Sequence, residues 1–170
     1  MVAGRPHTPG TPKAEEVRVA LAGLTADERA RLVLLDHVPA AAMPSLFDAL
    51  DVFAMPSVVE SFGTVYLESW LCRRPVVGAR IGAVACVIDD GRDGQLVDPA
   101  DPRETAAAVS ALLDDPELRA RMGEAGRAKT LARFTWDRLV DQVEAIYLDL
   151  ARRREHARSA GRGARSRPVS

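Results

Sequence analysis

Short apolar runs alternate with helix-length segments through the middle of the chain, and this alternation constrains the fold more than any other feature. Apolar runs of strand length cover residues 31–36, 51–55 and 75–79, and segments with helical spacing cover 44–50 and 62–72. Strands separated by helices need crossover connections, which predict a parallel sheet with helices on both faces. The sequence therefore predicts a doubly wound, Rossmann-like α/β fold.

The flanking segments extend this prediction. Residues 15–23 favour a helix and residues 25–28 a polar turn, while residues 95–97 suit a short strand at the sheet edge. Pro102 and Pro116 open two further helices. Thr135 is placed to cap a last helix, to about Arg153, with an apolar stripe of Leu139, Val143, Ile146, Tyr147 and Leu150.

We expect one partial domain over residues 14–153, with a disordered lead at 1–13 and a basic, disordered tail at 154–170. The last twenty residues hold seven arginines and one glutamate, a net charge of +6 that leaves −7 for the rest of the chain. Such a segment suits nucleic acid or anionic lipid, but it lacks the interleaved aromatic residues of a nucleic-acid site. A solvated tail without a nucleic-acid partner is the prediction.

The composition excludes several classes of protein. The 170 residues can bury one core, and no apolar stretch approaches the roughly 20 residues of a transmembrane segment. Because the N-terminus lacks the apolar segment of a secretory signal, we expect a cytoplasmic protein, with peripheral contact at the inner membrane surface left open. Cys72 and Cys86 have no histidine at metal-ligand spacing, so the sequence predicts neither a metal site nor a disulfide framework.

The loop at 56–63 is the predicted ligand site, because it follows one apolar run and leads into the next helix. Ligands of open α/β sheets bind beyond the carboxyl ends of the strands, and a helix N-terminus favours phosphate. Gly63 has no Cβ to hold a diphosphate away from the backbone, and Thr64 adds a hydroxyl donor. Backbone amides around Gly63, Thr64 and Val65 are therefore predicted to bind phosphate.

Two glutamates flank the start of this helix. Glu60 precedes it and suits the hydroxyls of a sugar, while Glu68 lies within it and suits the two hydroxyls of a ribose. Simpler interpretations exist: Ser61 as a helix cap, Glu60 as a partner of the helix dipole and Glu68 as a solvated side chain. The spacing of these residues leaves both interpretations open.

A longer stretch resembles the E-x7-E region of family 4 glycosyltransferases. The resemblance runs through residues 55–70 and 75–79, continues over 82–99, and returns at Phe134-Thr135-Trp136 and Tyr147. It covers about residues 24–150. It identifies the chain as the C-terminal, donor-binding half of a GT-B fold that lacks its first strand or strands.

The resemblance implies a bacterial-type enzyme of the hexosyltransferase class that transfers a sugar from a nucleoside-diphosphate sugar to an acceptor with retention, without a metal or other cofactor. Glu60 is then the catalytic-site residue that contacts the donor sugar. Val38 resembles a position that lines the pocket for the nucleotide base, and a place in the hydrophobic core is an equal alternative for this residue. The implied donor-binding residues are Ser61, Phe62, Gly63, Thr64, Val65, Glu68 and Val38.

The chain departs from the family pattern in two places. It lacks the early strand with a Gly-Arg pair and a following Lys, whose charges neutralise the leaving diphosphate, and it lacks the N-terminal acceptor-binding domain. Residues 83–86 stand where the family has a small residue and a Pro-Glu pair, so sugar contacts are not expected there. We therefore expect a truncated donor domain that is inactive by itself.

Two alternatives differ in class from a glycosyltransferase. A non-catalytic nucleotide-sugar-binding or partner-binding module, from a split or degenerate glycosyltransferase, would pair with the missing domain or with a complementary chain. A dinucleotide-dependent oxidoreductase would share the fold but needs Gly-x-Gly-x-x-Gly after a strand, and Gly78, Gly82, Gly91 and Gly94 do not fit that spacing. Glycosyl transfer is the leading prediction.

Overall fold

Two of the predicted apolar runs and the strand predicted at 95–97 form one parallel sheet in the computed structural model, which describes residues 2–3, 12–35 and 38–163. In their order across the sheet, the strands are β3 (Phe53–Met55), β4 (Val76–Ala79) and β5 (Gly94–Val97). The first residues of the three strands lie side by side in the register. All carboxyl ends therefore reach the same edge of the sheet, where ligands bind in parallel α/β folds.

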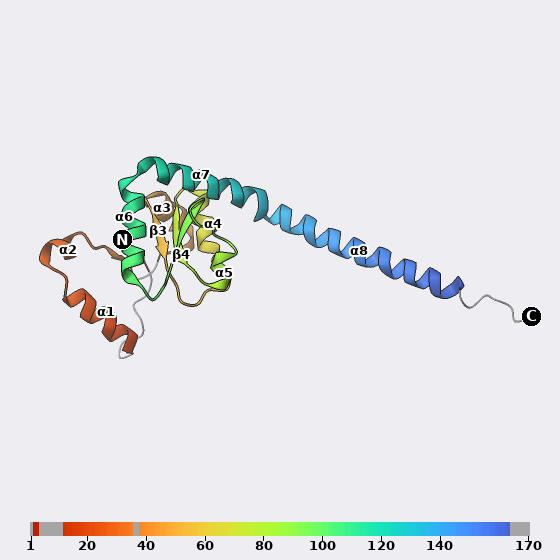
Figure 1. The fold of residues 1–170 in the computed structure, drawn as a ribbon, viewed down its shortest axis with the longest axis horizontal. Coiled ribbons are helices and arrows are strands. Elements are labelled where there is room, and N and C mark those ends of the chain that lie inside the picture. Colours follow the sequence, from red (N-terminus) through yellow and green to blue (C-terminus); the bar gives the residue numbers. More distant parts are fainter. Residues whose placement is uncertain (1, 4–11, 36–37, 164–170) are drawn as a thin grey trace, which may run out of the picture. The chain divides into compact units, whose positions relative to one another are not determined.

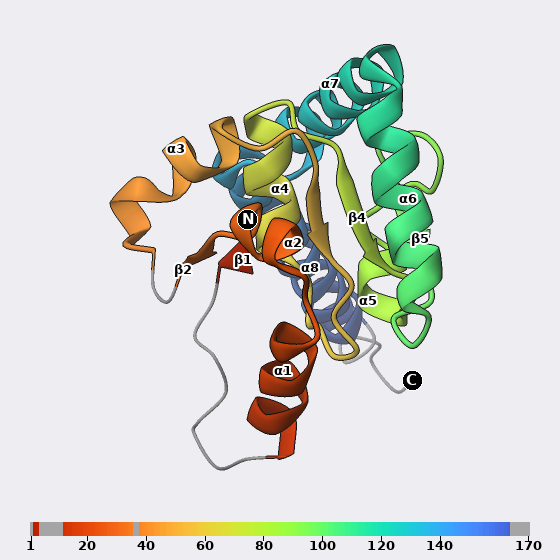
Figure 2. The same ribbon diagram turned by 90° about the vertical axis from the view of Figure 1, so that its left-hand side faces the viewer.

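Helices cover both faces of this sheet, and Figure 2 shows α4 and α6 on opposite sides of it. Neighbouring residues of a strand point to opposite faces, so Val76 packs with Tyr66 and Trp70 whereas Val77 packs with Leu112. The doubly wound α/β fold predicted from the sequence is confirmed. The helices are α4 (Thr64–Leu71), α5 (Gly82–Ala85), α6 (Pro102–Asp114) and α7 (Pro116–Arg133), of which α7 contacts both α4 and α6.

The long helices begin where the sequence predicts. Pro102 and Pro116 occupy first-turn positions in α6 and α7, and the aspartate before each proline accepts a backbone amide bond of 2.8 Å. Helix α8 (Trp136–Gly163) follows α7 along the chain (Figure 1). Thr135 caps it as expected, because its Oγ1 atom accepts a hydrogen bond of 3.4 Å from the Arg138 amide.

Helix α8 is longer than predicted, because it continues past Arg153 to Gly163. Three arginines and two alanines, which are good helix formers, make up half of the ten residues in this extension. Residues 164–170 of the predicted tail lie outside the described residues. The predicted apolar stripe from Leu139 to Leu150 is exposed along α8. Neither α8 nor any other helix in the described residues has the length and hydrophobicity needed to span a membrane.

The chain divides into two compact units, residues 1–49 and residues 50–170. In the first unit β1 pairs in parallel with β2. Strand β1 and the first residues of α1 fall within the lead that was predicted to be disordered, whereas residues 4–11 lie outside the described residues. The elements of this unit are β1 (Val2–Ala3), α1 (Pro12–Ala22), α2 (Ala26–Ala30), β2 (Leu34–Leu35), the 3-10 helix η1 (Ala40–Ala42) and α3 (Met43–Asp48).

Two predictions for the first unit were wrong. The polar turn at 25–28 is the start of helix α2, because Thr25 and Glu28 form a capping box in which each side chain accepts the other residue's backbone amide. The apolar run at 31–36 is a two-residue strand rather than a buried one, and Leu34 is 55% exposed. A strand is buried when neighbours and helices surround it, and β1 is its one partner within the described residues.

Candidate functional site

The predicted ligand loop joins the carboxyl end of β3 to the start of α4, as the sequence indicates. Met55 ends the strand, its carbonyl accepts a 2.9 Å hydrogen bond from the Ser57 amide, and Thr64 begins the helix. The loop therefore lies at the edge of the sheet where all three strands end.

Gly63 is required by the local geometry of this loop. It caps α4 in a left-handed conformation, with φ of 82° and ψ of 52°, which other residues adopt at a cost. A Cβ atom at this position would lie 2.5 Å from two carbon atoms of the Tyr66 ring. The glycine therefore has a structural reason to be present in addition to the predicted approach of a diphosphate.

Glu60 is half-buried and folds back onto its own loop. One carboxylate oxygen, Oε1, accepts a 2.9 Å hydrogen bond from the Ser61 amide and a 3.4 Å bond from the Phe62 amide. In this structure the amide of Phe62, one of the implied donor-binding residues, thus donates to Glu60. These bonds fix the position of a carboxylate immediately before the helix.

The exposed side of α4 carries Thr64 and Glu68. They lie one helical turn apart, which places them on the same side of the helix, and both are exposed. Within the described residues, no lysine or arginine forms an ion pair with Glu68. Ser61 is exposed and does not cap the helix, since Gly63 holds the cap position without a side-chain bond. The interpretation of Ser61 as a cap was therefore wrong.

The N-terminus of α4 is electrostatically suited to an anion. The amides of Thr64 and Val65 lie in the first turn, where a helix offers no carbonyl partners, and that turn contains no acidic residue. A cation is less available: Arg80 follows β4 at the same sheet edge, but its guanidinium binds the Leu96 carbonyl and, at 3.1 Å, the Glu104 carboxylate. The backbone amides of the first turn thus contribute positive charge at the loop, whereas the Arg80 guanidinium is engaged elsewhere.

An aromatic pair anchors the loop to α7, a contact that the sequence did not reveal. The rings of Phe62 and Phe134 pack edge to face with their centroids 5.7 Å apart, and Phe134 caps the end of α7. Both residues lie in segments that resemble one family pattern, but neither spacing nor composition indicates that they touch.

Tyr66 is a second residue that sequence reasoning did not select. It is fully buried, and its hydroxyl donates a 2.7 Å hydrogen bond to the Met55 carbonyl. Burial, and to a lesser degree the negative charge of Glu60, raises the pKa of Tyr66 to about 12, so the phenol is neutral at physiological pH. Its place among apolar residues of a helix made it look like an ordinary core residue.

Val38 is half-buried and belongs to the first compact unit, whereas the loop and α4 belong to the second. The other predicted site residues lie within one short stretch of chain. Its role in a base pocket stays a prediction.

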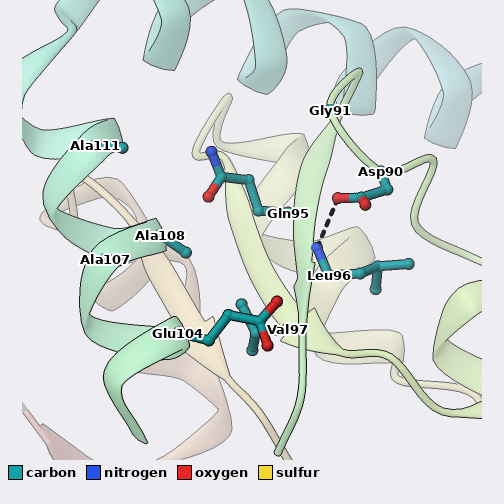
Figure 3. Close-up of a pocket in the computed structure, with 9 residues that line it drawn as sticks. All are labelled: Asp90, Gly91, Gln95, Leu96, Val97, Glu104, Ala107, Ala108 and Ala111. Atoms are coloured by element: carbon teal, nitrogen blue, oxygen red, sulfur yellow. Dashed lines mark hydrogen bonds between the residues drawn. The ribbon is translucent and has the colours of Figure 1, made fainter. Parts of the chain in front are cut away.

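A shallow groove elsewhere on the second unit contains none of the predicted site residues. It lies between β5 and α6, where Figure 3 shows Ala108 and Ala111 facing the strand. Its acidic residues are engaged: Asp90 accepts a 2.9 Å bond from the Leu96 amide, and Glu104 accepts a 2.7 Å bond from the Asp98 amide. These two carboxylates thus serve contacts within the protein, and the described residues hold no cluster of three potential metal ligands.

A parallel sheet covered on both faces, with a loop and a helix N-terminus beyond β3, defines a Rossmann-like domain with a candidate anion site. The sequence matches the family of Glycosyl transferases group 1 over residues 2–115. It is 40% identical over 121 residues to a D-inositol 3-phosphate glycosyltransferase of Corynebacterium diphtheriae, an alignment that covers 71% of this chain. The chain belongs to the group 1 glycosyltransferases.

Solved structures share the fold. Sucrose-phosphate synthase of Thermosynechococcus elongatus matches with a TM-score of 0.72 and 25% identity, over 86% of this chain and 37% of that one. The Anabaena protein HepE in complex with UDP-glucose matches with a TM-score of 0.74 and 24% identity, over 86% of this chain and 40% of that one. The chain spans 28% of the C. diphtheriae relative, so it corresponds to one part of a GT-B fold.

Proposed function

We propose that the protein binds a nucleoside-diphosphate sugar at the 56–63 loop and the N-terminus of α4. It would do so as the donor-binding half of a retaining family 4 glycosyltransferase whose acceptor-binding domain is supplied by other residues. The observation that carries this proposal is the placement of a helix N-terminus, whose first turn contains no acidic residue, between two carboxylates, Glu60 and Glu68, at the carboxyl edge of a parallel sheet.

Each group has a distinct role in the proposed complex. The first-turn amides of Thr64 and Val65 donate to the diphosphate, and Gly63 keeps that approach open. Glu68, exposed on the same side of α4 as Thr64, accepts hydrogen bonds from the ribose hydroxyls. Glu60 contacts the donor sugar, while Ser61, Phe62 and, in the base pocket, Val38 complete the predicted set.

The names of similar proteins support this choice of ligand class. The C. diphtheriae relative is a D-inositol 3-phosphate glycosyltransferase, and HepE was solved with UDP-glucose. The groups proposed to contact the ligand are carboxylates and backbone amides, which bind a diphosphate sugar directly. The binding is therefore expected to persist in EDTA.

The proposal is tested by titrating the chain with UDP, GDP, ADP and UDP-glucose in a calorimeter. At least one nucleotide should bind, and Glu68→Ala should weaken it roughly tenfold to a hundredfold, because a charged acceptor of two hydroxyls is lost. Glu144→Ala, which removes an exposed glutamate from α8, is the matched control and should bind like the wild type. If no nucleotide binds, or if both variants behave alike, the proposed site is wrong.

A non-catalytic nucleotide-sugar-binding module is the second candidate, and one observation favours it. Arg80, the cation at the correct sheet edge, is engaged by Glu104 and the Leu96 carbonyl. A departing diphosphate needs positive charge in the transition state, so binding can persist where transfer does not. Release of UDP from UDP-glucose separates the two candidates: the module binds the donor and leaves it intact with or without an acceptor domain.

A further inference from the structure

We propose that Tyr66 is a positioning residue that holds the Glu60–Gly63 turn and the first-turn amides of α4 in the geometry that binds the ligand. This inference rests on the proposed function, since it concerns the same site. Tyr66 touches no ligand in this scheme. It acts through the backbone groups that do.

The Tyr66 hydroxyl closes the base of the loop. Its 2.7 Å hydrogen bond to the Met55 carbonyl joins the third residue of α4 to the last residue of β3. The ligand loop comprises the residues between these two points. The bond therefore sets the distance between the strand end and the helix start, which a flexible loop would otherwise leave variable.

The Tyr66 ring supports the other end of the loop. It lies so close to Gly63 that a Cβ atom there would approach two ring carbons to 2.5 Å, and the Tyr66 amide donates a 3.0 Å bond to the Gly63 carbonyl. A Cβ at Gly63 would also lie 3.6 Å from Cγ of Glu60. A tilt of the ring would consequently move the glycine and, with it, the neighbouring amides and carboxylate.

The ring itself has little freedom to tilt. It is fully buried, and Phe53 packs against it edge to face with the centroids 6.0 Å apart. Gly78, which pairs with Met55 in the sheet, leaves the space for the hydroxyl, because a Cβ atom there would lie 3.2 Å from it. The core of the second unit thus fixes the phenol, and the phenol fixes the loop.

The phenol works as a neutral hydrogen-bond donor. Burial is the main cause that raises the pKa of the Tyr66 phenol to about 12, and the charge of Glu60 is the lesser cause. The phenol therefore keeps its proton at physiological pH. A donor to the Met55 carbonyl is what the geometry requires, and a phenolate would be a second acceptor there. The role is therefore structural support of a binding site and not proton transfer.

Two substitutions separate the ring from the hydroxyl. Tyr66→Phe keeps the packing and removes the bond to Met55, and we expect UDP affinity to fall roughly threefold to tenfold as the loop ends separate. Tyr66→Leu also removes the support under Gly63, and we expect a loss of roughly thirtyfold or more. If the leucine variant does not fold, the phenylalanine variant decides.

Ser69→Ala is the matched control. Ser69 is buried on the same helix, and its hydroxyl donates a 3.2 Å bond to the Arg74 carbonyl at the end of α4 away from the loop. Tyr66→Phe and Ser69→Ala should lower the urea midpoint of unfolding by similar amounts, but only Tyr66→Phe should lower the affinity for UDP. Unchanged UDP affinity in Tyr66→Phe, or an equal loss in Ser69→Ala, would overturn the proposal.

Hydrogen exchange distinguishes this inference from the proposed function. The Ser61 and Phe62 amides, which donate to Glu60, report the loop geometry without any ligand. Tyr66→Phe should accelerate their exchange severalfold relative to Ser69→Ala. If the wild type binds no nucleotide but these amides still exchange faster in Tyr66→Phe, the proposed function is wrong and the support of the loop by Tyr66 holds. If their exchange is unchanged in Tyr66→Phe, the positioning role is wrong.

Discussion

The indole ring of Trp70 in α4 lies directly against the α-carbon of Gly126 in α7. A Cβ atom on Gly126 would lie 2.1 Å from Cδ1 and 2.3 Å from Nε1 of the ring. The indole is fully buried, and its Nε1 atom donates a 2.8 Å hydrogen bond to the Asp93 carbonyl. The two helices can approach this closely because one of them carries a glycine at the contact.

Gly126→Ala should destabilise the protein by about 1–3 kcal/mol, because the added methyl group overlaps a ring that its own hydrogen bond holds in place. Urea unfolding followed by tryptophan fluorescence measures the change. Gly82→Ala is the control, since nothing lies within 4 Å of a Cβ atom there. Equal effects of the two substitutions would contradict the packing argument.

Lys129 of α7 should be the most costly single cation to remove. Its ammonium group contacts the buried Asp93 carboxylate, lies 3.1 Å from Asp89 and donates a 2.7 Å bond to the Val87 carbonyl. Lys129→Met leaves the Asp93 charge unpaired, and we expect a loss of about 3–5 kcal/mol in urea unfolding at neutral pH. Arg127→Met, which removes a partly exposed cation from the same helix, should cost less than about 1 kcal/mol.

The same variant should recover stability in acid. Burial already raises the pKa of Asp93 above its ordinary value of 3.8, and loss of the Lys129 charge should raise it further. A carboxyl with a raised pKa binds its proton more readily in the folded state, so stability rises as the pH falls from neutral toward 3.8. The deficit of Lys129→Met relative to the wild type should therefore be smaller at pH about 5 than at pH about 7.5, and an equal deficit would contradict this linkage.

The opposite sign applies to Asp89. The hydrogen bond from Lys129 is the main cause that lowers the pKa of Asp89. Burial has the opposite effect on this pKa but is weaker, because water still reaches the carboxylate. Asp89 therefore contributes stability above the ordinary value of 3.8 and loses that contribution as the pH falls through its lowered value. In Asp89→Asn, the acid unfolding curve should lose this component, which urea midpoints between pH about 5 and about 2 would reveal.

Asp90→Ala should open the outer edge of the sheet. The Leu96 amide on β5 donates to Asp90 at 2.9 Å, and without that acceptor a buried amide loses its partner at a cost of about 1–3 kcal/mol. Exchange of the Leu96 amide should accelerate roughly tenfold or more. The Val77 amide on the central strand should be unaffected, and uniform acceleration would indicate global destabilisation instead.

The Phe62–Phe134 contact should contribute a coupling energy of about 0.5–1.5 kcal/mol in a double-mutant cycle of leucine substitutions. Urea unfolding of the two single variants and the double variant measures it. Phe62→Leu should also lower the affinity for UDP, because it removes the contact that holds the loop to α7. A coupling energy of zero would show that the rings are neighbours without a stabilising contact.

Much of the fold could be predicted because local patterns decide it. Residues 51–55 and 75–79 contain strands β3 and β4, and Pro102 and Pro116 mark the starts of α6 and α7. The prediction of a buried strand at 31–36 was wrong. An apolar pattern indicates that a segment can be buried, but it does not show that neighbouring elements are present to bury it. The polar residues at 25–28 favour a turn by composition, although Thr25 and Glu28 also have the spacing of a capping box.

The candidate site divides in the same way. The glutamate pair and Gly63 could be selected from their order along the chain, because loop, cap and helix are consecutive. Tyr66 and Phe134 could not, since a buried phenol under a glycine and an edge-to-face ring pair depend on residues that fold together from separate elements.

The sequence by itself determined the alternation of strands and helices, the position of the 56–63 loop between a strand and a helix, and the family, because each depends on consecutive residues. The tertiary structure decided which groups at that loop are available. In the folded protein the Phe62 amide donates to Glu60, the Arg80 guanidinium binds Glu104, and the Tyr66 ring lies against Gly63. Hydrogen bonds and close packing between distant residues depend on three-dimensional proximity, which no local pattern specifies.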